Sequence, residues 1–328
     1  MSDDSVKPRI FAAFPGDAPA SLPVLAEELL ARQKTDWPAL RAAYTALEGV
    51  WERRMAPGHG SVILQCNPQR IRSTGADVAP EAIQARPCFL CPGNLPAAQQ
   101  AIDYRETFLI LCNPFPIFGR HFTLAHREHL AQSLSGAWPD LLQLAEDFHP
   151  GLAVLYNGPA CGASAPDHLH FQAVPRAAIP ILQKGAYGRK ILREAGGVTL
   201  FRTTDREPPA LVLEGGEREG LVPFLEKTLQ AMPRLRAAPQ EPLLNLFCHF
   251  EDGQWTVVLF PRRKHRPDVY YETGDRQILI SPGAVDMGGL LILPRTEDFQ
   301  RLDGAGIGRI FREVALSEED LEAIAAAL

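Results

Sequence analysis

The alternation of apolar and polar residues predicts a series of short strands along most of the chain. Runs with strand-like spacing lie at residues 61–70, 108–114, 121–129, 152–156, 243–250, 255–260 and 289–294. Leucines at helical spacing predict helices over 22–55, 141–148 and 318–328, and Ser317 is a good N-cap for the last one. Residues 206–220 are rich in Pro and Gly and are expected to be a connector.

One strand-like stretch stands out because it combines histidines with the strand period. His168, His170 and Gln172 alternate there with Leu169 and Phe171. Side chains two residues apart on a strand share a face, so the three polar groups are expected on one side and the apolar ones in a core. An imidazole oriented by its neighbours can act as a nucleophile. We therefore take His170 as the candidate nucleophile; an ordinary half-buried strand is the alternative.

Gln172 and the loop before the His170 strand add groups suited to a phosphorylated ligand. The Gln172 amide could donate to a phosphoryl oxygen that gains charge, but glutamine cannot act as a general acid, so the leaving group must depart unaided, as a phosphate or sugar phosphate can. The small residues of 157–164 let backbone N–H groups approach phosphates closely. Ser164 closes this loop and is a candidate catalytic residue together with His170 and Gln172.

A second polar group ends the strand at 61–70. Arg70 and Arg72 lie beside Ser73 and Thr74, and such a group could bind phosphate through charge-assisted hydrogen bonds or be a solvated loop. The candidate nucleotide- and phosphate-binding residues are Asn157, Gly162, Ala163, Ser164, Gln65, Asn67 and Arg70.

Cys88 and Cys91 form a Cys-x-x-Cys pair with the spacing of metal ligands. Two further ligands would complete a tetrahedral zinc site, with His126 or His129 as the third and His168 as the fourth. Four protein ligands leave no position for a catalytic water, so the zinc would be structural. A redox pair is the alternative, but such pairs usually begin a helix, and here Pro87 precedes the pair and a loop follows it.

Composition excludes several classes of protein. The 328 residues are 46% hydrophobic and 22% charged, which is typical of a globular protein. A formal charge of −6 and the lack of a basic stripe argue against nucleic-acid binding. There is no signal-peptide pattern and no long apolar run, so we expect a cytoplasmic protein without membrane contact.

The second half of the chain resembles the first. A strand at 255–260 leads into Arg262, Arg263, Lys264 and His265, much as the strand at 121–129 ends in histidines, and 289–294 takes the place of the His170 strand without a histidine. We therefore predict an α+β fold of two fused half-repeats, each a mainly antiparallel sheet with packed helices, the second chemically degenerate. The expected organisation is an N-terminal helical extension (1–59), a catalytic half (60–205) and a degenerate half (206–328).

These motifs together resemble the transferase branch of the histidine triad superfamily, which includes galactose-1-phosphate uridylyltransferases, dinucleoside tetraphosphate phosphorylases and GDP-hexose phosphorylases. Residues 168–172 match its His-x-His-x-Gln motif, and 88–94 look like the zinc segment of the uridylyltransferases. A bacterial family of this type shows Gln-x-Asn-Pro, Arg-Pro-Cys-Phe-Leu-Cys and Ala-Pro-Asp-His-x-His-Phe-Gln together, as this chain does. The likeness spans about residues 60 to 300.

The resemblance implies roles for individual residues. His170 would become nucleotidylated, zinc would be held by Cys88, Cys91, His126 and His168, and the segment from Asn157 to Ser164 would hold the α- and β-phosphates. The stretch 280–289 resembles one in the second half-repeat of the phosphorylases. Two features depart from the subgroups: 164–167 replaces the Cys-Ser-Asn-Pro run of the uridylyltransferases, and the phosphorylases generally lack the cysteine pair.

The expected activity is nucleotidyl transfer through a nucleotidyl-histidine, from an NDP-sugar or dinucleoside polyphosphate to inorganic phosphate. One alternative is a hexose-1-phosphate uridylyltransferase, which differs only in its acceptor. Others are a non-catalytic nucleotide sensor and a thiol redox protein. By analogy, a homodimer is the default expectation for such enzymes.

Overall fold

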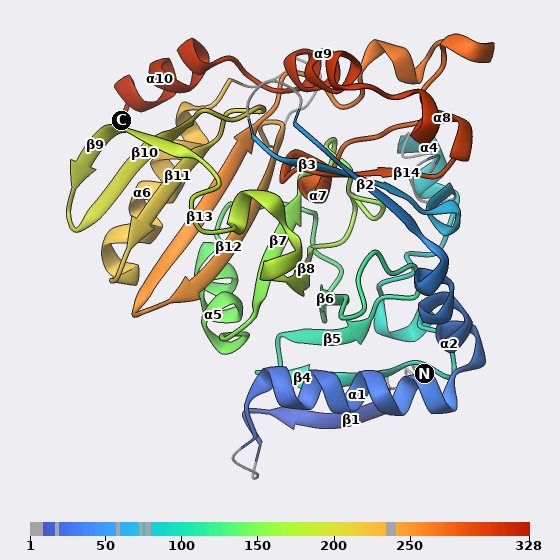
Figure 1. The fold of residues 1–328 in the computed structure, drawn as a ribbon. Coiled ribbons are helices and arrows are strands. Elements are labelled where there is room, and N and C mark those ends of the chain that lie inside the picture. Colours follow the sequence, from blue (N-terminus) through green and yellow to red (C-terminus); the bar gives the residue numbers. More distant parts are fainter. Residues whose placement is uncertain (1–8, 17–19, 57–59, 72–74, 76–79, 234–240) are drawn as a thin grey trace.

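The computed structural model describes residues 9–16, 20–56, 60–71, 75, 80–233 and 241–328. Within these ranges, most strands join one large sheet of eleven strands in the order β1-β4-β5-β6-β8-β7-β12-β13-β11-β10-β9 (Figure 1). All neighbours are antiparallel except β1 and β4. The bounds are β1 (Arg9–Phe14), β4 (Gln100–Tyr104), β5 (Phe108–Cys112), β6 (Phe122–His126), β7 (Leu152–Asn157), β8 (His170–Pro175), β9 (Gly188–Ala195), β10 (Val198–Thr204), β11 (Leu211–Gly215), β12 (Leu244–Glu251) and β13 (Gln254–Pro261).

The large sheet contains the same five-stranded topology twice. The first unit has the order β4-β5-β6-β8-β7, and α5 (Trp138–Asp147) lies between β6 and β7 in the chain. The second unit has the order β9-β10-β11-β13-β12, and α6 (Arg218–Ala231) lies between β11 and β12. The units meet where β7 pairs with β12, antiparallel. The predicted α+β fold with two half-repeats is thereby confirmed.

The correspondence of strands differs from the sequence prediction. The hairpin β12–β13 takes the place of β7 and β8, and not of the segment 121–129. The strand predicted at 289–294 is β14 (Leu290–Leu293), which lies outside the large sheet and pairs in parallel with β3 (Val62–Cys66). The sequence could not show this, because parallel pairing of segments so far apart leaves no local signal.

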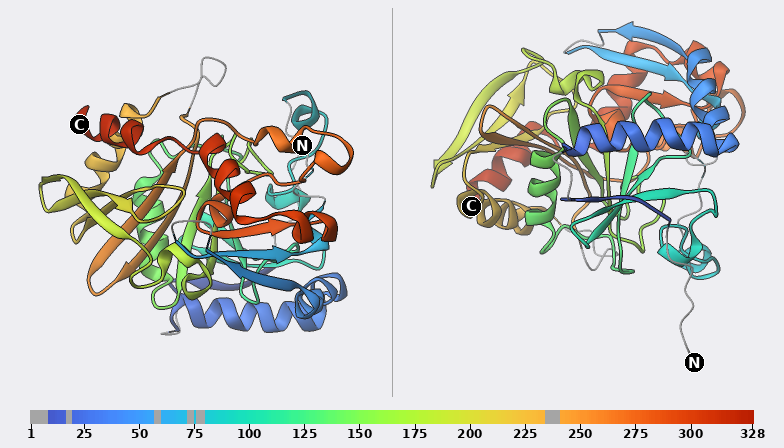
Figure 2. Two further views of the ribbon diagram at one scale, coloured as in Figure 1. Left: turned by 45° about the horizontal axis from the view of Figure 1, so that its top comes forward. Right: turned by 90° about the horizontal axis from the view of Figure 1, so that it is seen from below.

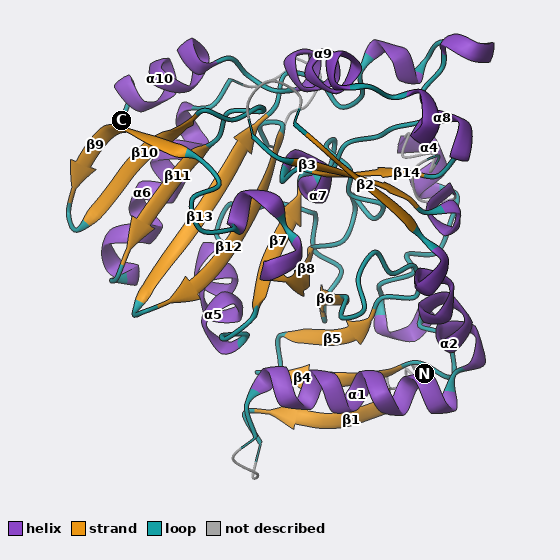
Figure 3. Ribbon diagram, in the orientation of Figure 1, coloured by secondary structure: helices purple, strands orange, loops and turns teal. Residues whose placement is uncertain are grey.

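A second sheet of three strands, in the order β14-β3-β2, forms a separate layer beside the large one (Figures 1 and 2). Its third strand, β2 (Trp51–Met55), pairs antiparallel with β3. The helices near it are α7 (Ala284–Met287), α8 (Thr296–Arg301) and α9 (Gly304–Val314), as Figure 3 shows. Apolar residues from both sheets and these helices bury one another, including Leu64, Phe247, Phe260, Leu291 and Phe311. This packing fixes the small sheet against one face of the large sheet.

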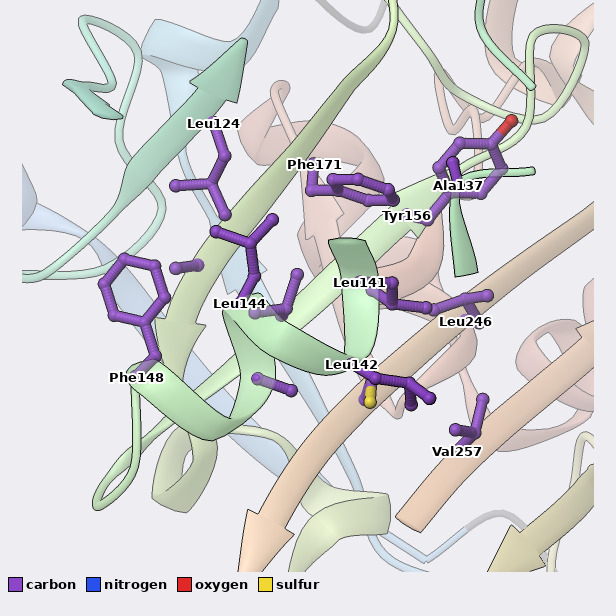
Figure 4. Packing of buried hydrophobic residues seen from close by; sticks show 14 of the residues in the cluster. Leu124, Ala137, Leu141, Leu142, Leu144, Phe148, Tyr156, Phe171, Leu246 and Val257 are labelled. Carbon is purple, nitrogen blue, oxygen red and sulfur yellow. The ribbon is translucent and has the colours of Figure 1, made fainter. Parts of the chain in front are cut away.

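Helices cover the opposite face of the large sheet: α1 (Leu22–Asp36), α2 (Pro38–Thr45), α5, α6 and α10 (Glu318–Ala326). Figure 4 shows the centre of this core, where Leu141 and Leu144 of α5 lie near Phe171 of β8. Phe171 and Ala173 belong to this core, whereas Val174 belongs to the core beneath the small sheet. By alternation His170 and Gln172 share the face of Val174, so both point toward the layer with the small sheet.

Several predicted elements are confirmed, and others were wrong in part. Ser317 caps α10 by accepting from the Asp320 N–H, as expected. The helix predicted over 22–55 ends at Thr45, because Gly49 breaks the spacing and β2 follows. The connector predicted at 206–220 contains β11 and the start of α6. The boundaries 1–59, 60–205 and 206–328 stay predictions, although β9 and β10 pair with the second unit.

Two further facts complete the fold. A short helix, α4 (Pro80–Gln84), precedes the cysteine pair. No helix in the described ranges combines the length and the apolar character needed to cross a bilayer. Arg72, Ser73 and Thr74, considered above as phosphate ligands, lie outside the described residues.

Candidate active site

His170 is the first residue of β8, and both its backbone and its ring are held by hydrogen bonds. Its N–H donates to Gln132 Oε1 at 2.8 Å, and its Nδ1 lies 2.8 Å from the carbonyl oxygen of His168. A carbonyl can only accept, so Nδ1 carries the proton and Nε2 keeps its lone pair. The ring is 4% exposed, and burial lowers its pKa to about 4. Among the described residues, no hydrogen bond engages Nε2.

Gln172 has its amide oriented by a histidine that the sequence prediction overlooked. The ring of His121, which is fully buried just before β6, accepts the N–H of Ile117 at Nδ1 over 3.1 Å. Its Nε2 must then carry the proton, and it donates to Gln172 Oε1 at 2.7 Å. Burial lowers the pKa of His121 to about 3, so the ring stays neutral. With its oxygen engaged, Gln172 presents its amide N–H groups to the other side.

Asn157 and the loop after it are joined to the second unit. Asn157 Oδ1 accepts from Asn245 Nδ2 at 2.8 Å and from the N–H of Ala284 at 2.7 Å. Gln132 Nε2 donates to the carbonyl oxygens of Asn157 and His170, at 2.9 and 3.1 Å. The side-chain oxygen of Asn157 is therefore used within the protein, and Gln132 links this strand end to His170.

Two glycines allow the small-residue loop to lie against the segment before α7. Gly162 has φ +94°, and a Cβ there would lie 3.1 Å from the Cα of Gly283. A Cβ on Gly283 would lie 3.1 Å from Asn157 Oδ1. Ala163 is buried in this loop, and the carbonyl of Ser164 accepts from Arg86 Nη2 at 3.1 Å. The loop is thus built for close backbone approach, here to the second half of the chain.

Gln65, Asn67 and Arg70 come from β3 and its exit, on the layer that faces His170 and Gln172. Gln65 donates to Glu52 Oε1 at 3.1 Å and accepts from Asn67 at 3.4 Å. Arg70 Nη1 donates to the Phe115 carbonyl at 2.8 Å. The charge of Arg70 further lowers the pKa of His121.

Asp286 of α7 is a buried carboxylate near Arg70. It accepts from the N–H groups of Gly283 and Ile292, both at 2.9 Å. Burial raises its pKa to about 6, while these hydrogen bonds and the charge of Arg70 oppose the shift. Asp286 therefore holds the segment before α7 in place and provides a negative charge beside Arg70.

Four residues brought together from three segments could hold a metal ion. One ligand atom from each of Cys88, Cys91, His129 and His168 lies within 4.8 Å of all the others. His168 Nδ1 is 3.4 Å from Cys88 Sγ and 3.6 Å from Cys91 Sγ, and His129 Nδ1 is 3.1 Å from Cys91 Sγ. Metal bonds of about 2.0–2.3 Å in a tetrahedral site place ligand atoms roughly 3.3–3.8 Å apart. The four residues fit such an ion.

The surroundings of this cluster also suit a metal. His168 Nε2 lies 2.7 Å from the carbonyl of His126, so Nε2 carries the proton and Nδ1 turns its lone pair toward the two sulfurs. Asn94 Nδ2 donates to the carbonyl of Cys88 at 2.8 Å and fixes the loop between the cysteines. Burial and the neighbouring Cys88 raise the pKa of the Cys91 thiol to about 11, so ion binding would displace protons.

On spacing alone, either His126 or His129 could be the third ligand. In the structure it is His129 that lies with the two cysteines and His168. The ring of His126 instead contacts the backbone of its own turn, with Nδ1 3.0 Å from the N–H of Glu128. His126 contributes its carbonyl oxygen to His168, and not its ring to the cluster. β6 ends at His126, so the chain must turn before a histidine can reach the cysteines, and His129 follows that turn.

Two cavities were found, and His170 lines neither of them. The first, about 590 Å³, lies between the small sheet and the exit of β8, and Gln65, Ile117, Pro175 and Arg206 are among its lining residues. The second, about 680 Å³, is lined by residues of the β10–β11 connection and the start of α10. The N–H of Ile117 is hydrogen-bonded to His121, so the first cavity adjoins the His121–Gln172 pair.

The structure thus brings predicted residues together and adds others that the sequence did not indicate. His170 and Gln172 share one face of β8, and the metal cluster precedes them through His168. Only the structure shows that four further residues support the site: His121, Gln132, Asn245 and Asp286. Their signal was weak, because isolated polar residues in apolar runs show no spacing that would link them to the histidine motif.

Comparisons with known proteins agree with the repeat. The model of a family described as a domain of unknown function (DUF4922) matches residues 29–175, and the model of the GDPGP1-like C-terminal domain matches residues 184–328. The first match ends with β8 and the second begins just before β9. A comparison with curated protein sequences found no match.

Among solved structures, yeast Ap4A phosphorylase Apa2 has a similar fold. Its complex with AMP gives a TM-score of 0.52 at 12% identity, covering 89% of this chain and 96% of the yeast chain. Its complex with Ap4A gives 0.50 at 11% identity, covering 87% and 98%. At this identity the likeness concerns the fold. The chain therefore matches a DUF4922 domain in its first half and a GDPGP1-like C-terminal domain in its second, and it shares the fold of the yeast phosphorylase.

Proposed function

We propose that the protein is a phosphorylase-type nucleotidyltransferase that forms a covalent intermediate on His170. The donor is an NDP-sugar or a dinucleoside polyphosphate, and the acceptor is inorganic phosphate. The observation that carries the proposal is the 2.8 Å contact between His170 Nδ1 and the His168 carbonyl, which leaves Nε2 as the nucleophilic atom. The yeast phosphorylase of similar fold binds AMP and Ap4A, and the GDPGP1-like match also indicates a nucleotide substrate.

In the first step, Nε2 of His170 attacks the α-phosphorus of the donor. A bond from nitrogen to phosphorus forms, and the bond from that phosphorus to the bridging oxygen breaks. The leaving group departs with the electron pair as a sugar phosphate or a nucleotide. The imidazole gains positive charge, and the Nδ1–H bond to the His168 carbonyl stabilises that charge.

In the second step, an oxygen of inorganic phosphate attacks the same phosphorus, and Nε2 leaves. This returns His170 to its starting form and releases a nucleoside diphosphate from an NDP-sugar donor. Gln172 donates from its amide to a non-bridging oxygen in both steps. His121 acts as a positioning residue, because it holds Gln172 Oε1 at 2.7 Å and so fixes the direction of the amide.

The metal in this proposal is zinc with a structural role. Cys88, Cys91, His129 and His168 would hold it, and four protein ligands leave no open position for water. The cluster would fix the backbone at His168, whose carbonyl orients the His170 ring. The loop before His168 is proposed to bind phosphate through its backbone, at Asn157, Gly162, Ala163 and Ser164.

A hexose-1-phosphate uridylyltransferase is the second candidate. It is favoured by the cysteine pair and its histidines, which resemble the zinc segment of that subgroup. Both candidates share the first step and differ in the second, where a sugar phosphate replaces inorganic phosphate.

The test is a donor and acceptor matrix. The purified protein is incubated with GDP-hexose, UDP-hexose or Ap4A, each with inorganic phosphate or hexose 1-phosphate, and products are separated by chromatography. We expect phosphate-dependent release of a nucleoside diphosphate from at least one donor, and none from His170→Ala. His149→Ala, which changes an exposed histidine outside the site, serves as the matched control. Turnover with hexose 1-phosphate but not with phosphate would favour the second candidate, and no turnover with any pair would contradict both.

A further inference from the structure

Arg206 is a buried cation that forms no ion pair with any described residue. It is 3% exposed, and its Nη2 donates to the carbonyl of Gly288 at 2.8 Å. Its Nε is buried and has no hydrogen-bond partner in the part of the chain that the structure describes. No carboxylate among the described residues lies within ion-pair distance of it; the adjacent Glu207 pairs instead with Arg312. A guanidinium buried in this way destabilises the fold unless a counter-charge is supplied.

The surroundings of Arg206 form a slot shaped for this side chain. Gly60 and Gly289 lie on either side of it, with φ of +83° and +101°. A Cβ on Gly289 would lie 2.7 Å from Arg206 Nη2, and one on Gly60 would lie 3.3 Å from its Cγ. Both glycines therefore leave space that the Arg206 side chain occupies. A single bond to Gly288 does not require a guanidinium, since a neutral amide could donate it equally well.

Arg206 lines both cavities, and the 590 Å³ one lies between the two layers. That volume lies in the range of small-ligand sites, about 300–1,000 Å³. Ile63, Phe118 and Leu290 give the cavity an apolar wall. Its other polar lining residues include two glutamines, a carboxylate and a second guanidinium: Gln65, Gln183, Glu52 and Arg54. The planar guanidinium fork matches the oxygens of a phosphoryl group.

We propose that this cavity is an anion site in which Arg206 binds the phosphoryl group of a small ligand. The ligand is either inorganic phosphate or a phosphomonoester whose body contacts the apolar wall. His170 does not line this cavity, although the cavity adjoins the His121–Gln172 pair through Ile117. Because the inference concerns binding and not turnover, it can fail or hold independently of the proposed reaction.

The experiment is calorimetric titration of the full chain with inorganic phosphate and, separately, with ribose 5-phosphate. We expect saturable binding of at least one of the two, weakened about tenfold or more in Arg206→Gln through loss of the charge-assisted hydrogen bonds, and weakened less in Arg206→Lys. Arg263→Gln is the matched control, because Arg263 lines only the other cavity and is exposed. Phosphate bound near His170 would appear as a second step that Arg206→Gln does not change.

Thermal unfolding keeps the test informative if calorimetry is ambiguous. Phosphate should raise the melting temperature of the wild type but not of Arg206→Gln, and without phosphate that variant should be no less stable than the wild type. If Arg206→Gln fails to fold, Arg206→Lys carries the comparison. Ala177→Trp, which narrows the cavity at an exposed position, should weaken binding of the ester more than that of phosphate if the ligand is an ester. Equal binding of both ligands by wild type and Arg206→Gln, or no binding by the wild type, would overturn the proposal.

Discussion

The two five-stranded units share one topology but differ in the connection between their last two strands. In the first unit, β7 and β8 are joined by a loop from Gly158 to Leu169, which holds the small-residue segment and His168. In the second, β12 and β13 are joined by the tight turn Asp252–Gly253, both with positive φ. A two-residue turn leaves no room for a ligand loop.

The strands that follow these two connections also differ, because only the one in the first unit carries a histidine. β8 begins with His170 and faces the small sheet with Gln172, whereas β13 carries no histidine and donates from Trp255 to the carbonyl of Leu142. The second unit contributes support: Asn245 holds Asn157, and Arg262 holds Asn245 at 2.5 Å. The repeated fold thus supplies the frame, while one longer loop and the residues that follow it supply the chemistry.

The largest effect is expected from His170→Ala. Removing a nucleophile should lower turnover by about 10³-fold or more, because the covalent step disappears. Thr256→Ala, on the matching strand of the second unit, should leave turnover within twofold of the wild type. Steady-state rates with the best donor and phosphate check both. A similar loss of turnover in both variants would contradict the claim that only the first unit carries the chemistry.

Removal of the metal is expected to have the second-largest effect. Chelation or Cys88→Ser should lower the free energy of unfolding by about 4 kcal/mol if the ion is present at a thousandfold excess over its dissociation constant. Thermal unfolding and elemental analysis measure this together. Cys248→Ala, a buried cysteine of the second unit, should leave metal content unchanged. A wild-type protein that contains no metal and is indifferent to chelators would contradict the structural zinc.

A smaller effect is expected at the His121–Gln172 pair. Gln172→Ala and His121→Phe should each lower kcat by about 10- to 100-fold with little change in KM, since a preorganised donor acts mainly in the transition state. The double variant should lose little more than either single one, because both act through the same amide. Additive losses would indicate that His121 has only a packing role. Gln172→Glu, which keeps the shape but not the donor, should not restore activity.

The smallest effect concerns stability in acid and a histidine of the second unit. Burial and the charge of Arg176 lower the pKa of His249 to about 4, with Glu251 opposing and His149 adding to the shift. In the unfolded chain His249 binds a proton near pH 6.5, whereas the native ring does so only near pH 4. The contribution of the neutral ring to the free energy of unfolding is therefore complete above about pH 6.5 and is lost as the pH falls toward 4. His249→Phe should reduce the slope of unfolding free energy by at most about 1.4 kcal/mol per pH unit. An unchanged slope in urea titrations would show that His249 is protonated alike in both states.

Local patterns were enough to predict β5, β6, β7 and β8 of the first unit, with the motif at 168–172, and the last helix, whereas β4 was missed. The strands missed were those without a one-sided pattern. β9 is an edge strand whose side chains are mostly exposed, so it shows no apolar alternation. β14 was found as a strand but given the wrong partner, since parallel pairing with β3 joins distant segments. Spacing left two histidines open for the metal cluster, and only the turn after β6 selects His129.

The central claim is that His170 takes up a nucleotidyl group. Its most direct test is intact-mass and peptide analysis of the wild type after incubation with the best donor in the absence of phosphate. We predict an acid-labile gain of one nucleotidyl group on the peptide containing His170, removed by added phosphate and absent from His170→Ala. Turnover without any such adduct, or an adduct on another residue, would contradict the account.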